Sequence, residues 1–264
     1  MPFGWLKAKG DRADLDSVPA EGFADIHSHV IPDVDDGPKT WDDAMAILER
    51  AAQGGTRLMI ATPHGDTRAR WKDTKVLTGS CHALNEALRQ KGIPLTIVLG
   101  MENPLEPRLP ERVQKGSALA MNGSPYVLVE LPYTQLPLYW EEVLFQLQLK
   151  GKRPIIAHPE RQSQIQEDPT LLAGPVSRGV LAQLTAASLT PVFGPRVRKA
   201  AEELLKRDFV HFIASDTHAA EGPRGPDILP GFHAAVKVVG RDRAVELAVR
   251  NPRAVALGKD LLSV

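Results

Sequence analysis

The chain has 264 residues, 43% of them hydrophobic, and its 32 basic side chains balance its 32 acidic ones. This length and composition favour one globular domain, and the charge balance excludes a global field that would recruit nucleic acid or an anionic membrane. The lone Cys81 excludes an intramolecular disulfide and an all-cysteine metal site, and we interpret it as a small helix residue in a reducing compartment.

The expected location follows from two further features. No apolar run approaches the roughly 20 residues that a membrane span needs, and the N-terminus lacks the apolar segment of a signal peptide. We therefore expect a cytoplasmic protein with no transmembrane segment, and the sequence leaves its oligomeric state open. Residues 1–22 are polar and lack apolar periodicity, so we expect a poorly ordered arm before a single domain at 23–264.

Short apolar runs then alternate with amphipathic stretches. Seven runs have the length of buried strands: 23–26, 58–61, 95–99, 126–129, 154–157, 180–184 and 209–214. Apolar residues at three and four spacing predict helices over 41–53, 72–90, 139–150 and 196–206, with Thr40 as a helix cap. A loop is expected over 222–231 and a last short helix over 251–262. Buried strands separated by helices predict a distorted parallel (β/α) barrel of seven strands, TIM-like in architecture.

Candidate metal ligands follow these strands in order. They are His27 and His29 after the first strand, His64 after the second, Glu102 after the third, Glu130 after the fourth, His158 after the fifth, and Asp216 and His218 after the seventh. The carboxyl ends of barrel strands meet at one rim, so these side chains are expected to converge there. Alternation along a strand aims His27 and His29 to one side, as it does Asp216 and His218.

The type of donor narrows the chemistry. Five imidazoles and at least three carboxylates, without a thiolate, suit Zn, Mn or Fe and exceed what one tetrahedral ion requires. Carboxylates that bridge two or three ions are implied, and such a cluster favours hydrolysis of a phosphate ester. Asp25 shares the predicted face of His27 but lies deeper, so we expect it to support the site without binding metal. The remaining histidines, His82, His211 and His233, are interpreted as ordinary surface or core residues.

These motifs resemble the PHP (polymerase and histidinol phosphatase) superfamily. The resemblance lies in Asp25-Ile26-His27-Ser28-His29, Ala61-Thr62-Pro63-His64, Gly100-Met101-Glu102, Ala157-His158-Pro159-Glu160-Arg161 and Ser215-Asp216-Thr217-His218. More narrowly, Asp33-Val34-Asp35-Asp36-Gly37, Val129-Glu130-Leu131 and 211–216 resemble the bacterial capsular polysaccharide phosphatases, manganese-dependent protein-tyrosine phosphatases. The resemblance covers residues 23–262.

The resemblance implies three metal ions. It groups His27, His29, Glu102 and Asp216 at one ion, Glu102, Glu130 and His158 at a second, and Asp36, His64 and His218 at a third, with Asp35 as the alternative to Asp36. It implies that Arg161 and an arginine in the loop after the last motif, best matched by Arg224, hold the phosphate. The implied substrate is phosphotyrosine in the tail of a bacterial tyrosine kinase that governs exopolysaccharide synthesis, with manganese as cofactor.

We hypothesise that a metal-bound hydroxide attacks phosphorus in line while the ions and both arginines neutralise the non-bridging oxygens. Arginine suits this role because its planar fork binds phosphate through two hydrogen bonds. The leaving group of phosphotyrosine has a pKa of about 10, so a site with few general acids favours aryl esters. The polar segment 184–194 either lines the mouth of the barrel or only turns the chain.

Three alternatives remain at this stage. The same metal cluster serves small-molecule phosphatases such as one for histidinol phosphate. Metal-dependent amidohydrolases and nucleases also begin with His-x-His on the first strand, but commonly use a carbamylated lysine, and no lysine here ends a predicted strand. A barrel that only binds a partner or a metal would have gaps in its ligand set, and this chain has none.

Overall fold

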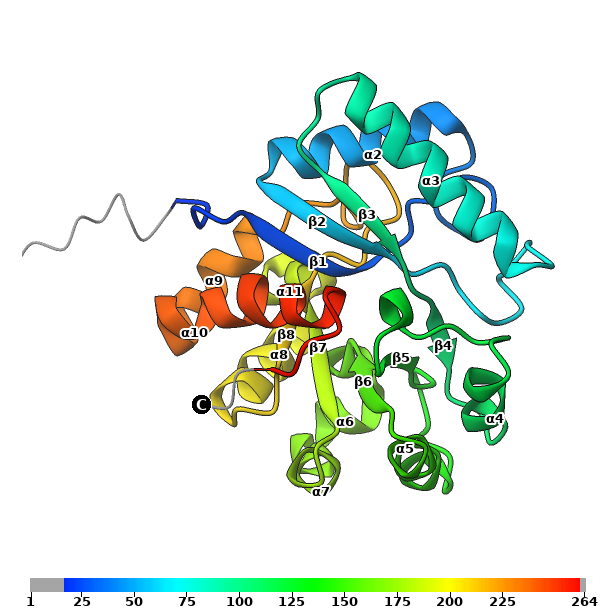
Figure 1. Cartoon of the computed structure of the whole chain (residues 1–264). Helices are drawn as coiled ribbons and strands as arrows, with labels where there is room; N and C mark the ends of the chain where they lie inside the picture. The colour runs from blue at the N-terminus through cyan, green and yellow to red at the C-terminus, as the bar shows by residue number, and fades with distance from the viewer. Residues whose placement is uncertain (1–16, 262–264) are drawn as a thin grey trace, which may run out of the picture.

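The computed structural model describes residues 17–261. Most of the predicted N-terminal arm, and the end of the predicted last helix, lie outside the described residues. Eight strands run parallel to their sheet neighbours: β1 Phe23–Ser28, β2 Thr56–Ala61, β3 Thr96–Leu99, β4 Glu102–Pro104, β5 Tyr126–Glu130, β6 Arg153–Ala157, β7 Leu181–Thr185 and β8 Phe212–Ala214. They form two sheets, β1-β2-β3 and β4-β5-β6-β7-β8, which together make the wall of a barrel (Figure 1). The predicted parallel barrel is confirmed, with eight strands instead of the expected seven.

The third wall segment is interrupted, which the sequence did not predict. The expected run 95–99 ends at β3, and after Gly100 and Met101 the chain starts a separate strand, β4. A side chain at Gly100 would come within 2.9 Å of the Ile60 side chain, so glycine permits this close approach to β2. One isolated parallel bridge joins the two sheets here, between His64, which follows β2, and Glu102 at the start of β4. The interruption places Glu102 at the start of a strand and near the residues that follow β2.

Hydrogen bonds also join the first and last strands. The Asp216 amide donates to the His27 carbonyl at 2.9 Å, and the His29 amide donates to the Thr217 carbonyl at 2.8 Å. Ser28 and Thr217 form a parallel bridge at the same level. These contacts bring both ends of the sequence motif series to one side of the barrel.

Helices surround the strands. The four predicted helices occur as α2 Trp41–Gln53, α3 Thr74–Gln90, α5 Trp140–Leu149 and α8 Pro195–Lys206, each within two residues of its predicted ends. The other helices are α4 Leu109–Gln114, α6 Ser163–Glu167, α7 Ala173–Ser177, α9 Leu229–Val239, α10 Arg241–Val245 and α11 Asn251–Ala256. Thr40 caps α2 as predicted, in a reciprocal hydrogen-bond pair with Asp43. α2 and α3 lie outside β2 and β3 (Figure 1).

Three boundary predictions were wrong. The strand expected over 209–214 begins only at Phe212. The expected loop 222–231 is shorter, because α9 begins at Leu229, where Pro230 occupies the first helical turn and needs no backbone donor. The last helix begins at Asn251 as predicted but ends at Ala256 rather than at 262, and Gly258 follows with a φ of 66°. That left-handed conformation suits glycine and stops a helix.

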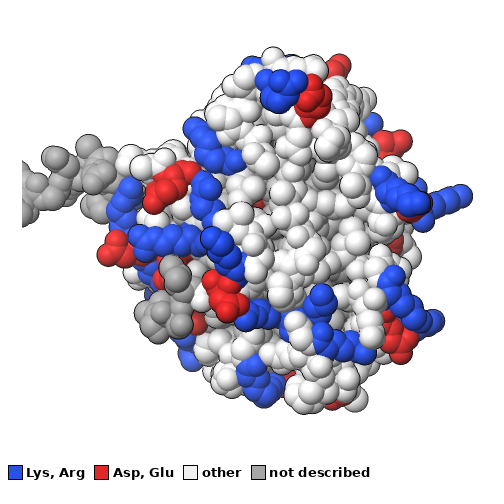
Figure 2. Space-filling view, viewed as in Figure 1, with Lys and Arg blue, Asp and Glu red and all other residues white. Residues whose placement is uncertain are grey.

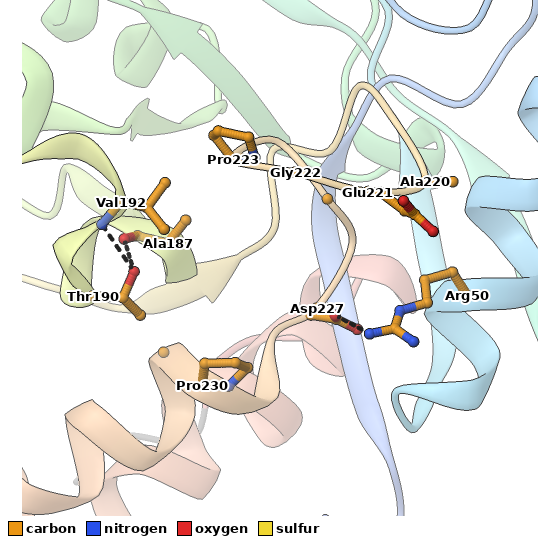
Figure 3. Close-up of a pocket in the computed structure, with 12 residues that line it drawn as sticks. Arg50, Ala187, Thr190, Val192, Ala220, Glu221, Gly222, Pro223, Asp227 and Pro230 are labelled. Carbon is orange, nitrogen blue, oxygen red and sulfur yellow. Dashed lines mark hydrogen bonds and ion pairs between the residues drawn. The ribbon is translucent and has the colours of Figure 1, made fainter.

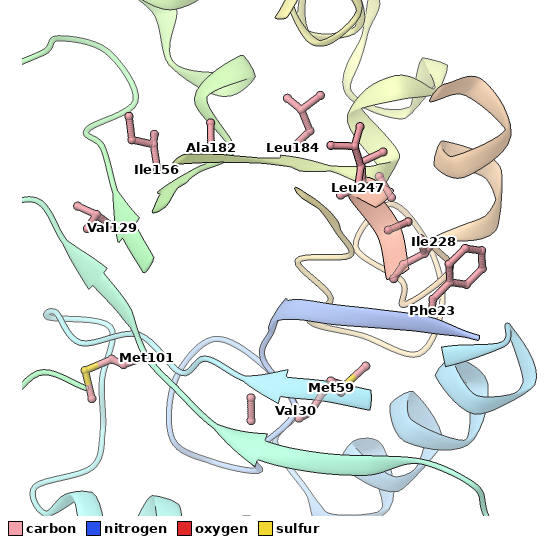
Figure 4. Packing of buried hydrophobic residues seen from close by; sticks show 14 of the residues in the cluster. Phe23, Val30, Met59, Met101, Val129, Ile156, Ala182, Leu184, Ile228 and Leu247 are labelled. Atoms are coloured by element: carbon pink, nitrogen blue, oxygen red, sulfur yellow. The ribbon is translucent and has the colours of Figure 1, made fainter. Parts of the chain in front are cut away.

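The apolar core has two layers. Val127 and Val129 of β5 face an outer layer between barrel and helices, while Tyr126 and Leu128 face an inner cluster. Figure 4 shows outer-layer side chains such as Ile156 pointing away from the ring of strands. The inner cluster also contains Val255 and Ala256 of α11, which close the amino end of the barrel. The carboxyl end therefore remains available for polar residues.

The surface agrees with the neutral composition. Figure 2 shows acidic and basic side chains together around the edge of one face, with a largely uncharged middle. Within residues 17–261, no helix is both long and apolar enough to cross a membrane.

The contact between α9 and the 3-10 helix Ala186–Leu189 yields a stability prediction. A Cβ atom at Gly231 would lie 2.3 Å from the Ala186 carbonyl oxygen. We expect Gly231→Ala to lower the free energy of unfolding by about 1–3 kcal/mol, as overpacking does. Gly79→Ala is the matched control, because no atom lies within 4 Å of its added Cβ and it sits inside α3. This control should raise stability by about 0.5–1 kcal/mol. Urea denaturation measures both, and equal effects would contradict the packing argument.

Candidate metal centre

The predicted metal ligands meet at the carboxyl end of the barrel. We call them the rim cluster: His27, His29, Asp36, His64, Glu102, Glu130, His158, Asp216 and His218. Eight of them are buried, and the Asp36 side chain is 42% exposed. Burial of so many ionisable groups is costly unless they pair with one another or hold ions. Their mutual distances therefore decide what the cluster can do.

A bulge in β1 aims the first histidine. Asp25 pairs with Met59 and Ser28 pairs with Ala61, so three steps along β1 match two along β2. One extra residue in a strand reorients the side chains that follow, and bulges are common beside active sites. The bulge lets His27 reach the Gln183 side chain inside the barrel, where its Nδ1 lies 2.9 Å from Oε1.

The expected orientation of Asp25 was wrong. Its paired residue Met59 belongs to the outer core layer, and its carboxylate accepts hydrogen bonds from the amide and hydroxyl of Ser215. It also accepts from the backbone amide of His27 at 3.1 Å. Asp25 thus supports the site through the backbone of β1 and the end of β8, without touching either imidazole of the His-x-His pair.

Two members of the rim cluster occupy a rare backbone conformation. His158 has a φ of 32° and Asp216 a φ of 53°, both in the left-handed region. Each comes directly or shortly after a strand, β6 or β8. Such a conformation costs free energy in a residue other than glycine, and it persists where surrounding structure imposes it, often at functional sites.

The first group of ligand atoms surrounds the His-x-His pair. One donor atom each from His27, His29 and Asp216 lies within 4.8 Å of the others. The Nε2 atoms of His27 and His29 each lie 3.4 Å from Glu102 Oε2. The structure therefore brings together the four residues expected at the first ion.

The second group centres on the other oxygen of Glu102. His158 Nε2 lies 3.0 Å from Glu102 Oε1 and 4.0 Å from Glu130 Oε1. Glu130 is also ion-paired with Arg68, which contacts Asp66 as well. Asp66 could hold a metal together with His64 and Glu130. Neither Asp66 nor Arg68 was a candidate from sequence, because their loop matches no motif and has no periodicity.

The third group selects between two neighbouring aspartates. Asp36 Oδ1 lies 3.3 Å from His64 Nε2 and 3.2 Å from His218 Nε2, and these residues form a possible metal group with His29. Asp35 has a different position. Its carboxylate lies 2.8 Å from His29 Nδ1 and accepts hydrogen bonds from the amides of Gly37 and His64.

Polar contacts fix the imidazole orientations. Gln183 holds Nδ1 of His27, Asp35 holds Nδ1 of His29, and the carbonyl of Asp216 holds Nδ1 of His218. A partner on one ring nitrogen leaves the other nitrogen for a metal. Sequence reasoning missed Gln183, although a lone polar side chain inside the apolar run 180–184 was a usable signal.

The residues present fit divalent cations. Among the described residues, both ring nitrogens of His64 and Oε2 of Glu102 are buried and make no hydrogen bond of acceptable geometry, although His64 Nδ1 lies 2.8 Å from that oxygen. Buried donors and acceptors are normally satisfied, so these atoms are suited to coordination. The set of imidazoles and carboxylates without thiolate suits Zn, Mn or Fe.

Charges within the cluster shift the pKa values of its histidines and carboxylates. Burial lowers the pKa of His27, but the charges of Glu102 and Asp216 outweigh it and raise this pKa to about 9. Burial also lowers the pKa of His64, but the carboxylates of Asp36 and Glu102 outweigh this effect and raise the pKa to about 10. Burial by itself would raise the pKa of Glu102, yet the surrounding imidazoles hold it well below its usual range. The Glu102 carboxylate is therefore ionised at neutral pH.

Both predicted phosphate-binding arginines border the cluster. Arg161 Nη1 lies 2.6 Å from Asp216 Oδ2, and its Nη2 donates to Thr185 Oγ1 at 3.0 Å. Arg224 contacts His218, and its Nη1 lies 3.3 Å from Asp36 Oδ2. The two guanidinium groups thus approach the cluster from different loops.

The loop that carries Arg224 also borders a pocket of 320 Å³. Thr217 Oγ1 donates to the carbonyls of Ala219 and Arg224 and so ties the loop ends together. Figure 3 shows Glu221 to Pro223 on one side of the pocket and Thr190 with Val192 on the other. The segment 184–194 therefore lines space at the mouth and also turns the chain through two 3-10 helices.

Comparison with known proteins identifies the family. A family model described as capsular polysaccharide synthesis, CpsB/CapC, matches residues 23–256. The chain belongs to this family. The tyrosine-protein phosphatase YwqE of Bacillus subtilis (strain 168) is 34% identical over 194 residues, which are 74% of this chain and 76% of that protein. The tyrosine-protein phosphatase CpsB of Streptococcus pneumoniae is 28% identical over 242 residues, 88% of this chain and 98% of that protein.

Solved structures agree with this membership. One from work on YwqE of Bacillus subtilis and CpsB of Streptococcus pneumoniae, described as unique metal-dependent tyrosine phosphatases, has a TM-score of 0.86 and 30% identity and covers 90% of this chain and 96% of its own. A histidinol phosphate phosphatase from Lactococcus lactis has a TM-score of 0.55 at 14% identity and covers 84% of this chain and 94% of its own. The second likeness shows the fold alone.

The raised histidine pKa values predict that metal binding releases protons. His27 and His64 must lose their protons before their nitrogens can coordinate an ion, and their pKa values of about 9 and about 10 lie above neutral pH. We expect proton release on Mn²⁺ binding at pH 7. Below the histidine pKa values, apparent metal affinity should fall about tenfold for each unit by which the pH is lowered, for each proton displaced. Calorimetry in two buffers of different ionisation enthalpy counts the protons. Zero release with pH-independent affinity would contradict the expectation.

The contact between Gln183 and His27 predicts a role in metal affinity. Gln183→Leu removes the acceptor that orients the imidazole, and loss of such a contact typically costs 10- to 100-fold in metal affinity, so we expect a decrease of about that size. Gln162→Leu is the control, because Gln162 is equally buried but accepts from the amide of Ile165 at the start of α6. Metal titration of both variants measures the difference, and similar affinities would disprove the orienting role.

Proposed function

We propose that the chain is a metal-dependent protein-tyrosine phosphatase that hydrolyses phosphotyrosine through divalent ions held by the rim cluster. The observation that carries this proposal is the convergence of nine imidazole and carboxylate side chains, with two arginines beside them, at the open end of the barrel. Membership in the CpsB/CapC family supports it, because relatives there are named tyrosine-protein phosphatases.

The bound ions and the two arginines would have different roles. Ions bound to the rim cluster would supply Lewis-acid stabilisation of phosphate oxygens and lower the pKa of a coordinated water. Arg161 and Arg224 would hold the non-bridging oxygens, which carry the negative charge of the transition state. Arg161 is well placed for this role because Asp216 and Thr185 fix its guanidinium group. Catalysis would then rest on positioning and electrostatics.

An aryl ester suits this arrangement. Glu102 and Asp216 of the rim cluster are ionised at neutral pH and its histidines are suited to metal coordination, so few groups remain to protonate a leaving oxygen. A tyrosine oxygen, with a pKa of about 10, departs with less proton donation than an alkyl oxygen needs. The site therefore favours phosphotyrosine over phosphoserine.

Finer parts of the proposal come from the family. We propose manganese as the ion, a cytoplasmic location, and the phosphorylated tail of a bacterial tyrosine kinase that controls capsular polysaccharide synthesis as the substrate. The description of the matching family as capsular polysaccharide synthesis proteins supports this assignment. The donor set, without thiolate, is compatible with manganese and equally with zinc or iron.

Single substitutions in the rim cluster test the function. We expect His27→Ala, Glu102→Ala and Asp216→Ala to lower kcat/KM for a phosphotyrosine peptide, assayed with Mn²⁺, on the order of 100-fold or more, since each removes a group that holds an ion. His82→Ala is the control, because His82 is exposed on α3 away from the cluster. Circular dichroism verifies folding. Near-full activity of all three folded variants would end the proposal.

The substrate class needs a separate assay. The wild-type protein should hydrolyse phosphotyrosine peptides at least tenfold faster than histidinol phosphate, because the proposed site favours an aryl leaving group. Rates at equal substrate concentration with Mn²⁺, Zn²⁺ and Fe²⁺ also compare the ions. A preference for histidinol phosphate would replace the protein phosphatase with a small-molecule phosphatase on the same metal centre.

A further inference from the structure

A second pocket lies beside the rim cluster, next to the ends of β4 and β5. It has a volume of 330 Å³ and is distinct from the pocket under the Arg224 loop. Glu130 belongs both to its lining and to the rim cluster, so the two spaces adjoin. Its charged lining also includes Asp66 and Arg68, and the rest of the lining is formed by Pro104, Leu105, Leu131, Pro132 and Tyr133.

Tyr133 connects this pocket to the rim cluster. Its ring stacks on the His158 ring with 5.6 Å between centroids and only 9° between planes. His158 in turn lies 3.0 Å from Glu102, the residue shared by the first two groups of ligand atoms. Tyr133 is nevertheless 43% exposed, so only part of its surface is covered. The Tyr133 ring therefore contacts one predicted ligand, His158, and remains partly exposed to solvent.

The position of this ring is fixed by the chain around it. Pro132 restricts the backbone directly before Tyr133, and the Tyr133 carbonyl accepts a hydrogen bond from the Ser163 amide at 2.8 Å. A ring held in this way is a suitable platform for another aromatic group.

The charges of the pocket argue against a second anion. Two carboxylates, Asp66 and Glu130, face one guanidinium, Arg68, which is ion-paired with both. A phosphate or acidic side chain would meet net negative charge there. An uncharged ring meets prolines, leucines and an aromatic face, and 330 Å³ exceeds the roughly 150 Å³ apolar cavity that accommodates benzene.

We propose that Tyr133 determines specificity for aryl phosphates, by packing against the phenyl ring of the substrate while the adjoining pocket receives that ring. This inference rests on the proposed phosphatase function and adds the means by which the site selects phosphotyrosine. The phosphate would lie at the rim cluster and the ring beside it, against the exposed surface of Tyr133. Aromatic contacts of this kind contribute a modest share of binding, which corresponds to a change of roughly 2- to 12-fold in affinity.

Binding of two probes tests the inference without turnover. Phenylphosphonate carries a phenyl ring on a group that phosphatases do not hydrolyse, and inorganic phosphate lacks the ring. We expect Tyr133→Ala to weaken phenylphosphonate binding to the Mn²⁺-loaded protein roughly 2- to 12-fold, with less than a twofold change for phosphate. Tyr133→Phe should bind both probes like the wild type, because it keeps the ring. Isothermal titration calorimetry gives each dissociation constant.

Tyr139→Ala is the matched control. Tyr139 lies in the same connection between β5 and α5 and is 42% exposed, nearly the same as Tyr133, but does not line the pocket. It should bind both probes like the wild type. In activity assays, Tyr133→Ala should raise KM for phenyl phosphate over the same range and leave kcat within about twofold, since the ring acts in binding.

Two results would overturn the inference. An equal loss of affinity for both probes would mean that Tyr133 only supports His158, and unchanged phenylphosphonate binding would mean that the substrate ring lies elsewhere. Failure of the proposed function has a different signature, because the wild type would then hydrolyse no phosphotyrosine peptide under any metal. The ratio of the two binding constants is still measured in that case.

Discussion

Four imidazole rings converge on one buried carboxylate, and the rest of the site depends on this interaction. The nearer oxygens of Glu102 lie 3.4 Å from the Nε2 atoms of His27 and His29, 2.8 Å from Nδ1 of His64 and 3.0 Å from Nε2 of His158. An isolated carboxylate would not remain ionised in the interior, but these neighbours keep its pKa low. With two oxygens among four imidazoles, Glu102 links the separate groups of candidate ligand atoms and would be able to serve more than one cation.

The barrel wall departs from regular strand geometry where it carries these residues, and these departures cost conformational free energy. The break between β3 and β4 sets Glu102 at a strand start, the bulge in β1 turns His27 inward, and His158 and Asp216 adopt left-handed conformations. Each departs from regular strand geometry, and each lies within or beside the rim cluster. The closed amino end of the barrel, with its inner apolar cluster, supplies the stability that holds these strained residues in place.

The surroundings of the cluster offer two kinds of contact. Arg161 and Arg224 border it beside β6, β8 and the segments that follow them, where a phosphate would find positive charge. Tyr133 and the neighbouring prolines border it beside His158 and give a partly apolar surface. A phosphomonoester of an aromatic alcohol joins a dianionic group to a neutral ring, so it could use both kinds of contact.

From the sequence came the parallel barrel, its four main helices and eight candidate ligands in strand order, while Asp36 followed only from the family resemblance, with Asp35 as its alternative. The barrel and the eight ligands could be predicted because apolar periodicity reflects local burial, and because the carboxyl ends of parallel strands must meet at one rim. The tertiary structure alone decided which residues meet. It separated Asp35 from Asp36, turned Asp25 toward Ser215, and brought Gln183, Arg68 and Tyr133 to the cluster. A bulge, a strand break and two left-handed residues shift side chains without leaving a period or a motif in the sequence, because they result from packing between segments far apart in the chain.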